Sequence, residues 1–188
     1  MTSGRITQPS IVLLDSNVII AAHELGIWEW LTQRYRILVP SVVVKTEVLF
    51  YATGRRERGR VPIHLSEQAE AGRIEELTAT ATELARVYAG FDPSFVGGLH
   101  AGEAEGLALF LAGRVGEAAF CSGDALAIQA LAMLGFAQQG VSLEVLLGRK
   151  KHGGVLAPQF TDDFLCRNLS RGQENRITGM GLNTRLLD

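Results

Sequence analysis

The chain has 188 residues, of which 47% are hydrophobic and 20% are charged. This length is enough to bury one substantial core but too short for two ordinary domains, and the composition excludes an intrinsically disordered chain or a polycationic coat for nucleic acid. Because the formal net charge is −2, any cationic surface has to be local.

The cysteine content and the absence of sorting signals predict a cytoplasmic protein without a membrane partner. Cys121 and Cys166 form neither a CxxC pair nor part of a disulfide-dense pattern, which is typical of a reducing compartment. The first ten residues lack the apolar core of a signal peptide. No apolar run approaches the roughly 18 residues that a membrane-spanning helix needs.

The beginning of the chain predicts strands that alternate with helices. Residues 11–14 form a short apolar run of the kind that is buried on both faces of a parallel sheet. A helix is expected directly afterwards, with Ser16 as its cap, and a second strand is expected at 37–39. After Pro40, residues 42–52 show a helical pattern that their valines weaken.

The middle of the chain repeats this alternation. Residues 53–65 combine glycine and proline breaks with four arginines, which predicts a loop or a short hairpin. One or two helices are expected within 67–90, and another at 101–112. A second apolar run, 118–121, is followed by Ser-Gly-Asp and a helix that reaches residue 134.

These elements predict an α/β fold, namely a three-layer α/β/α sandwich with a mainly parallel central sheet, because parallel strands need crossover helices. We expect an N-terminal tail at residues 1–10 and one domain at 11–151, whose last short element begins at residue 141. Residues 152–188 are expected to form a partly helical C-terminal extension.

Two acids stand directly after or close behind the two apolar runs. Asp15 and Asp124 therefore lie near the carboxyl ends of predicted parallel strands, where open α/β sheets bind their ligands. Asp is also a common helix N-cap, and either residue could serve only that structural purpose. Alone, neither position decides between a ligand site and a cap.

Further acids lie within predicted helices. Glu47 is surrounded by apolar residues in VVVKTEVLFYA, and a partly buried carboxylate needs a partner or a metal ion. Glu103 and Glu105 flank the apolar stripe of their helix on opposite sides. Since residues two apart do not share a helix face, we expect only one of the two to face the site, and the periodicity does not decide which.

Four segments together resemble the PIN-domain nucleases: IVLLDSNVIIAA, PSVVVKTEVLF, GEAEGLALFLA and AFCSGDALAIQALAMLG. The resemblance covers about residues 11–151. It implies a catalytic site built from the four acids of the family, which here are Asp15, Glu47, Glu103 or Glu105, and Asp124. The spacing to Asp124 slightly favours Glu105 over Glu103, and polar support is expected from Ser16, Asn17 and Ser122.

The chemistry of such a site follows from its donor atoms. Clustered carboxylates repel one another unless a divalent cation neutralises them, and Mg²⁺ or Mn²⁺ prefers oxygen ligands. The expected metal ligands are Asp15, Asp124 and one of Glu103 and Glu105. A metal site of this kind activates water and polarises a phosphoryl group, so we expect hydrolysis of phosphodiester bonds in single-stranded RNA.

The arginine-rich segment is the main positive cluster of the chain. Its guanidinium groups suit bidentate contacts with RNA phosphates, although a solvated surface loop is the simpler interpretation. The residues concerned are Arg55, Arg56, Arg58 and Arg60. A homodimer that places these loops beside the acidic clefts would supply the positive field that the chain otherwise lacks.

Several alternatives remain at this point. A haloacid dehalogenase-type phosphatase needs a second acid two positions after Asp15, where this chain has Asn17. A catalytically silent binding protein would keep the fold without the chemistry. Within the nuclease interpretation, the family context implies the toxin of a toxin–antitoxin pair, whereas the long segment between Glu47 and Glu103 and the C-terminal extension favour an RNA-processing nuclease.

Overall fold

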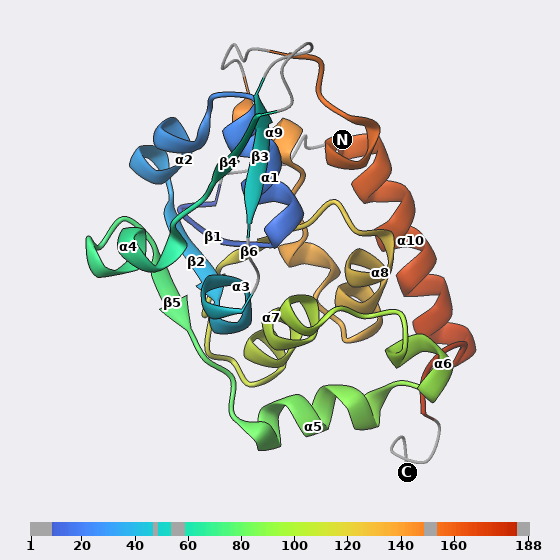
Figure 1. Cartoon of the computed structure of the whole chain (residues 1–188). Helices are drawn as coiled ribbons and strands as arrows, with labels where there is room; N and C mark the ends of the chain where they lie inside the picture. The colour runs from blue at the N-terminus through green and yellow to red at the C-terminus, as the bar shows by residue number, and fades with distance from the viewer. Residues whose placement is uncertain (1–8, 47–48, 54–58, 149–153, 184–188) are drawn as a thin grey trace.

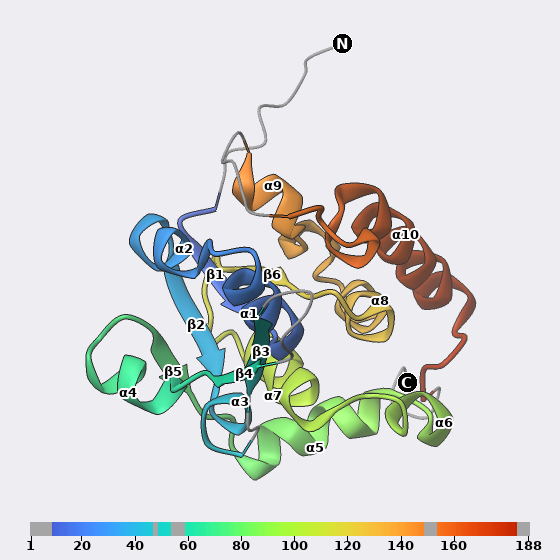
Figure 2. The ribbon, with the colours of Figure 1, turned by 45° about the horizontal axis from the view of Figure 1, so that its top comes forward.

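The computed structural model describes residues 9–46, 49–53, 59–148 and 154–183. Four parallel strands form its central sheet, in the order β5-β2-β1-β6 (Figure 1). The strands are β1 (Ile11–Leu14), β2 (Arg36–Pro40), β5 (Glu75–Leu77) and β6 (Ala119–Cys121). Helices cover both faces of this sheet, which confirms the predicted α/β/α sandwich (Figures 1 and 2).

The two helical layers follow from the alternation of side chains along β1. Val12 and Leu14 point into one core and Leu13 into the other, as expected for a strand that is buried on both faces. The first core is covered by α1 (Ser16–Glu24), α2 (Trp28–Arg34) and α9 (Leu143–Leu147). The second is covered by α5 (Ala81–Gly90), α7 (Ala101–Leu111) and α8 (Ala125–Met133).

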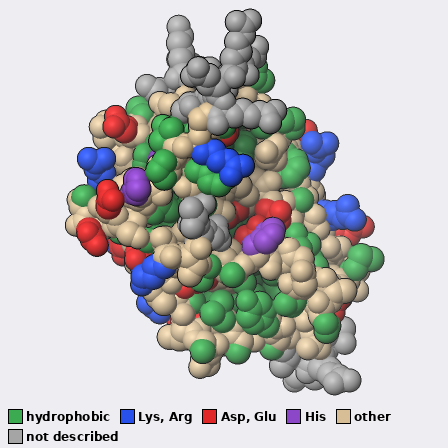
Figure 3. All heavy atoms as spheres, viewed as in Figure 1, with side chains coloured by type: hydrophobic (Ala, Val, Ile, Leu, Met, Phe, Trp, Pro, Cys, Tyr) green, Lys and Arg blue, Asp and Glu red, His purple; other side chains and the backbone are tan. Residues whose placement is uncertain are grey.

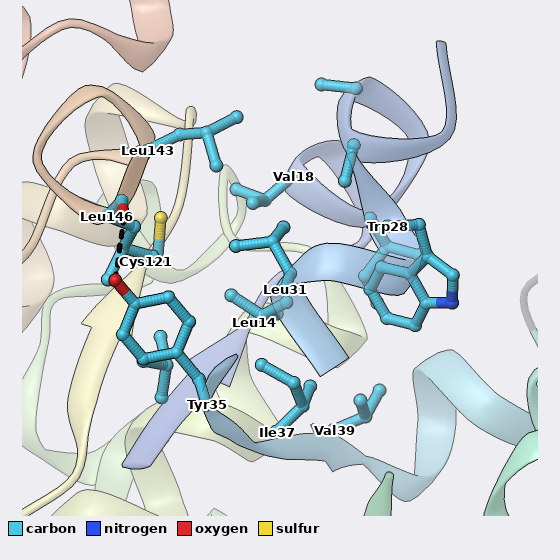
Figure 4. Close-up of a cluster of buried hydrophobic side chains, with 14 of the residues drawn as sticks. Leu14, Val18, Trp28, Leu31, Tyr35, Ile37, Val39, Cys121, Leu143 and Leu146 are labelled. Atoms are coloured by element: carbon cyan, nitrogen blue, oxygen red, sulfur yellow. Dashed lines mark hydrogen bonds between the residues drawn. The ribbon is translucent and has the colours of Figure 1, made fainter. Parts of the chain in front are cut away.

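Figure 4 shows the first core, where side chains from α1, α2, α9 and the strands meet. Tyr35 lies among them almost wholly buried, and its hydroxyl donates a hydrogen bond to the carbonyl oxygen of Leu146 at 2.7 Å. The buried phenol is therefore satisfied. This contact ties the end of α2 to α9, more than a hundred residues later in the chain.

The helix predicted for 42–52 ends at Lys45, and the described residues 50–52 form a strand instead. Helix α3 (Ser41–Lys45) is short, and β3 (Phe50–Thr53) pairs antiparallel with β4 (Gly59–Pro62). Phenylalanine, tyrosine and threonine favour strands, and β3 packs the partly buried Tyr51 against the first core, so local preference and tertiary packing agree here. For 53–65 a loop or a short hairpin was expected. The structure shows a hairpin whose second strand, β4, lies in this stretch and whose first strand, β3, begins earlier, at Phe50.

The strand β5 lies inside the stretch 67–90, where only helices are expected. It runs between α4 (Leu65–Glu70) and α5 at one edge of the sheet. Its residues, Glu75 to Leu77, are only partly buried and carry no apolar run, unlike those of β6 at the opposite edge, which are fully buried. Ion pairs from Arg36 and Lys45 hold its two glutamates.

The C-terminal part of the described chain forms a long helix, α10 (Asp162–Thr178), that lies along α8 (Figure 2). The close approach depends on Gly172, since a Cβ atom there would lie 2.4 Å from the carbonyl oxygen of Gln129. Three further short helices complete the described part: α6 (Pro93–Val96), η1 (Ala137–Gln139) and η2 (Pro158–Phe160). Within the described residues, no helix combines the length and the apolar character needed to cross a membrane.

Candidate functional site

The site begins where two neighbouring parallel strands end. Asp15 follows β1 directly, and Ser122 and Asp124 follow β6. Because β1 and β6 are paired, their carboxyl ends meet at one edge of the sheet, and the backbone N–H of Asp15 donates to the carbonyl oxygen of Cys121 at 3.1 Å. A pocket of about 460 Å³ opens here, lined by Asp15, Ser16, Asn17, His100, Ala101, Glu103 and Asp124. Figure 3 shows acidic side chains gathered with a histidine on this face of the molecule.

Asp15 caps helix α1 and also lines the pocket. Its Oδ1 atom accepts a hydrogen bond from the backbone N–H of Ser16 at 2.6 Å, so Asp15, and not the predicted Ser16, is the N-cap of α1. Its Oδ2 atom accepts from Nδ2 of Asn17 at 2.9 Å and from Oγ of Ser122 at 2.7 Å. Only 4% of the residue is exposed, and these donors hold the carboxylate in one orientation.

Two polar side chains join the two strand ends. The Ser122 hydroxyl donates to Asp15 and accepts from the backbone N–H of Asp124 at 3.0 Å. Asn17 donates to Asp15 through Nδ2 and accepts from the backbone N–H of Gly123 through Oδ1 at 2.9 Å. Both residues, which the sequence predicts as polar support, therefore orient the acids.

Asp124 is the N-cap of α8 and is only partly buried. Its Oδ1 atom accepts hydrogen bonds from the backbone N–H groups of Leu126 at 2.7 Å and Ala127 at 3.0 Å. Its Oδ2 atom has no hydrogen-bond partner within the ranges that the structure describes. That oxygen leaves Asp124 with a free acceptor at the pocket.

Glu103 reaches the same pocket from the first turn of α7. It is 4% exposed, and its Oε2 atom accepts a hydrogen bond from the backbone N–H of His100 at 2.9 Å. The pKa of Glu103 is raised to about 7, chiefly by burial and also by the negative charges of Asp15 and Asp124, while the hydrogen bond and charge of His100 oppose this rise. Folding therefore brings three carboxylates together against their mutual repulsion.

Glu105 occupies a different place, which corrects the preference drawn from its spacing. Its Oε1 atom accepts hydrogen bonds from Oγ of Ser41 at 2.8 Å and from the backbone N–H of Ala79 at 3.0 Å. Its Oε2 atom accepts from the backbone N–H of Val42 at 2.7 Å. Glu105 thus ties α7 to the ends of β2 and β5, whereas Glu103 faces the ends of β1 and β6.

The remaining predicted site residues divide into two groups. Glu47, Arg55, Arg56 and Arg58 lie outside the described residues. Arg60 lies on β4, is exposed, and places its guanidinium carbon 4.4 Å from the centre of the Phe50 ring. His100 was not expected at the site, yet its Nδ1 lies 3.5 Å from Oε1 of Glu103. The sequence feature that could have pointed to His100 is its position at the start of a helix, three residues before Glu103.

The donor atoms of the pocket suit a hard divalent cation. They are carboxylate oxygens of Asp15, Glu103 and Asp124, the ligand type that Mg²⁺ and Mn²⁺ prefer. Across the described ranges, no group of three or more His, Cys, Asp and Glu side chains is arranged to enclose a metal ion. Mg²⁺ commonly keeps several waters and uses one or two carboxylates, so the open oxygen of Asp124 together with a neighbouring acid fits it.

We expect the pKa of Glu103 to make the metal-free protein less stable as pH rises. Between about pH 4.5 and 7 the unfolded chain has released this proton and the folded protein still holds it, so the free energy of unfolding falls with pH. The raised pKa of His100, caused first by Glu103, acts in the same direction. Urea midpoints measured across this range in a chelator check the slope, and Glu103→Gln should flatten it. An equally steep decline in that variant would contradict the assignment.

No protein-family model, curated protein or solved structure matches this chain. The resemblance to PIN-domain nucleases thus depends on the four sequence segments, and membership of that family stays a prediction. Function has to be argued from the pocket itself, since an α/β sandwich supports many unrelated activities.

Proposed function

We propose that the protein is a metal-dependent ribonuclease that hydrolyses phosphodiester bonds of single-stranded RNA. Mg²⁺ or Mn²⁺ would bind in the pocket of Asp15, Glu103 and Asp124, through the open oxygen of Asp124 and a neighbouring acid. The observation that carries the proposal is the convergence of three carboxylates, from three separate elements, on one pocket at the carboxyl edge of a parallel sheet. Buried like charges are unfavourable without a counter-charge, and a divalent cation supplies one.

The residues around the pocket have distinct tasks in this proposal. When bound, the metal ion would polarise the phosphoryl group of the substrate and lower the pKa of a bound water. Asp15 is fixed by Asn17 and Ser122, so its carboxylate holds one orientation without cost at the moment of reaction. Asp124 offers its free Oδ2 atom. Glu103, whose pKa is about 7, can hold or release a proton near neutral pH.

The choice of RNA as substrate comes from the resemblance to PIN-domain nucleases. The cytoplasmic setting fits the two cysteines, both of which are free thiols, Cys121 buried and Cys166 exposed. The homodimer and an antitoxin that covers the acidic pocket stay predictions of the sequence analysis. So does Glu47 as a fourth acid of the site.

The direct test is cleavage of single-stranded RNA by the purified protein. We expect cleavage with Mg²⁺ or Mn²⁺, loss of cleavage in excess EDTA, and recovery when the metal ion is added back in excess over the chelator. An Asp15→Asn preparation purified in the same way controls for contaminating ribonuclease. Equal cleavage with Mg²⁺ and with EDTA, or in both preparations, would contradict the proposal.

A further inference from the structure

We propose that Phe50 and Arg60, on the outer face of the β3–β4 hairpin, form a platform on which one unpaired base of single-stranded RNA stacks. This inference deepens the proposed nuclease function and depends on it for the identity of the ligand. These two side chains would favour single-stranded RNA over a duplex. Neither side chain belongs to the acidic pocket.

The hairpin has one packed face and one open face. Tyr51 points inward, where its ring centre lies 5.5 Å from that of His23 on α1. Phe50 precedes it on β3 and therefore points to the opposite face, where 39% of the residue is exposed. Arg60 pairs with Ala52, which shares the face of Phe50, and this register lays the guanidinium over the ring. The inner contacts thus leave Phe50 and Arg60 exposed on the outer face of the hairpin.

The chemistry of this pair suits a nucleotide. The Arg60 guanidinium lies over the Phe50 ring, so the surface offered to a base is a planar cation backed by an aromatic ring. Such a cation stacks on bases or contacts phosphates, and the exposed part of the ring adds stacking area. Within the described part of the chain, Arg60 has no carboxylate partner. Its positive charge is therefore available to a polyanion, which the acidic pocket alone would repel.

The platform lies on the same side of the molecule as the pocket. Strand β3 packs against α1, whose first residues, Ser16 and Asn17, line the pocket. In Figure 3 a basic side chain lies over the hairpin, on the face where the acidic side chains and a histidine gather. We therefore expect one strand of RNA to stack a base on the hairpin while another part of its backbone enters the pocket. A paired base cannot do this without leaving its duplex.

The test measures stacking without cleavage. Short single-stranded RNA with a fluorescent adenine analogue is titrated with the full-length protein in EDTA, and the fluorescence quench reports stacking. We expect Phe50→Leu to bind at least about fivefold more weakly and to lose the quench, and Phe50→Trp to retain both. Tyr88→Leu is the matched control, because Tyr88 is similarly exposed on α5 and outside the site. Circular dichroism verifies that each variant is folded.

The outcomes separate this inference from the proposed function. A Phe50→Leu protein that binds and quenches as wild type does, a protein that binds no single-stranded RNA, or one that binds the matching duplex equally well overturns the platform. Quenching that depends on Phe50 supports it even if no cleavage follows with Mg²⁺. In that case only the nuclease function is contradicted. Metal-dependent cleavage with an unaffected Phe50→Leu protein leaves the function standing and removes the platform.

Discussion

Replacing Asp15 with asparagine is expected to reduce metal-dependent RNA cleavage by about a thousandfold or more. A carboxylate that shares a divalent cation contributes several kcal/mol to stabilising the charge of a phosphoryl transition state, and about 1.4 kcal/mol corresponds to a factor of ten. Asp15 lies at the centre of the pocket, oriented by Asn17 and Ser122. Initial rates at saturating Mg²⁺, measured with the same RNA for both proteins, give the ratio.

The same substitution should change stability by only about 1 kcal/mol, because asparagine is as good an N-cap as aspartate. The amide oxygen can still accept from the backbone N–H of Ser16, and the Ser122 hydroxyl can turn to accept from the new amide. Nδ2 of Asn17 loses its acceptor at this position, and that lost hydrogen bond accounts for the expected cost. Loss of the negative charge also removes repulsion from Glu103. Urea unfolding in EDTA checks this expectation. An unfolded Asp15→Asn protein would instead indicate that Asp15 is mainly a structural cap.

Glu103→Gln and Glu105→Gln are expected to have opposite effects although the two residues lie on the same turn of α7. Glutamine at 103 should reduce cleavage about a hundredfold or more, since it removes a charge of the pocket. It should leave stability at neutral pH unchanged or higher, because folding no longer buries that carboxylate beside two others. Cleavage rate and urea midpoint are measured on the same preparations.

Glutamine at 105 should destabilise the fold by about 1–3 kcal/mol and spare the activity of the folded fraction. The Glu105 carboxylate, 2% exposed, accepts three hydrogen bonds, and an amide nitrogen in place of one oxygen would face the N–H groups of Val42 or Ala79. Each variant is thus the control of the other. A stable but inactive Glu105→Gln protein together with an active Glu103→Gln protein would reverse the assignment.

The local sequence is sufficient to predict those features of this protein that depend on burial and on the order of elements along the chain. The runs 11–14 and 118–121 are apolar throughout because helices cover both faces of these two parallel strands, and acids after such runs lie near the ligand edge of the sheet. The α/β/α sandwich and the candidate roles of Asp15 and Asp124 therefore follow from pattern alone. The edge strand β5 does not, since its few residues bury little and carry two glutamates.

Tertiary structure decides what depends on which neighbours a residue meets. Helical periodicity does not separate Glu103 from Glu105, and their spacing to Asp124 slightly favours Glu105. In the fold, α7 directs Glu103 toward the ends of β1 and β6, and Glu105 toward the ends of β2 and β5. The tertiary structure also shows that Asp15 both caps a helix and lines the pocket. It caps α1 through Ser16, and β6 brings Ser122 beside it at the pocket. Such distinctions arise from contacts between segments far apart in the chain, which no local periodicity encodes.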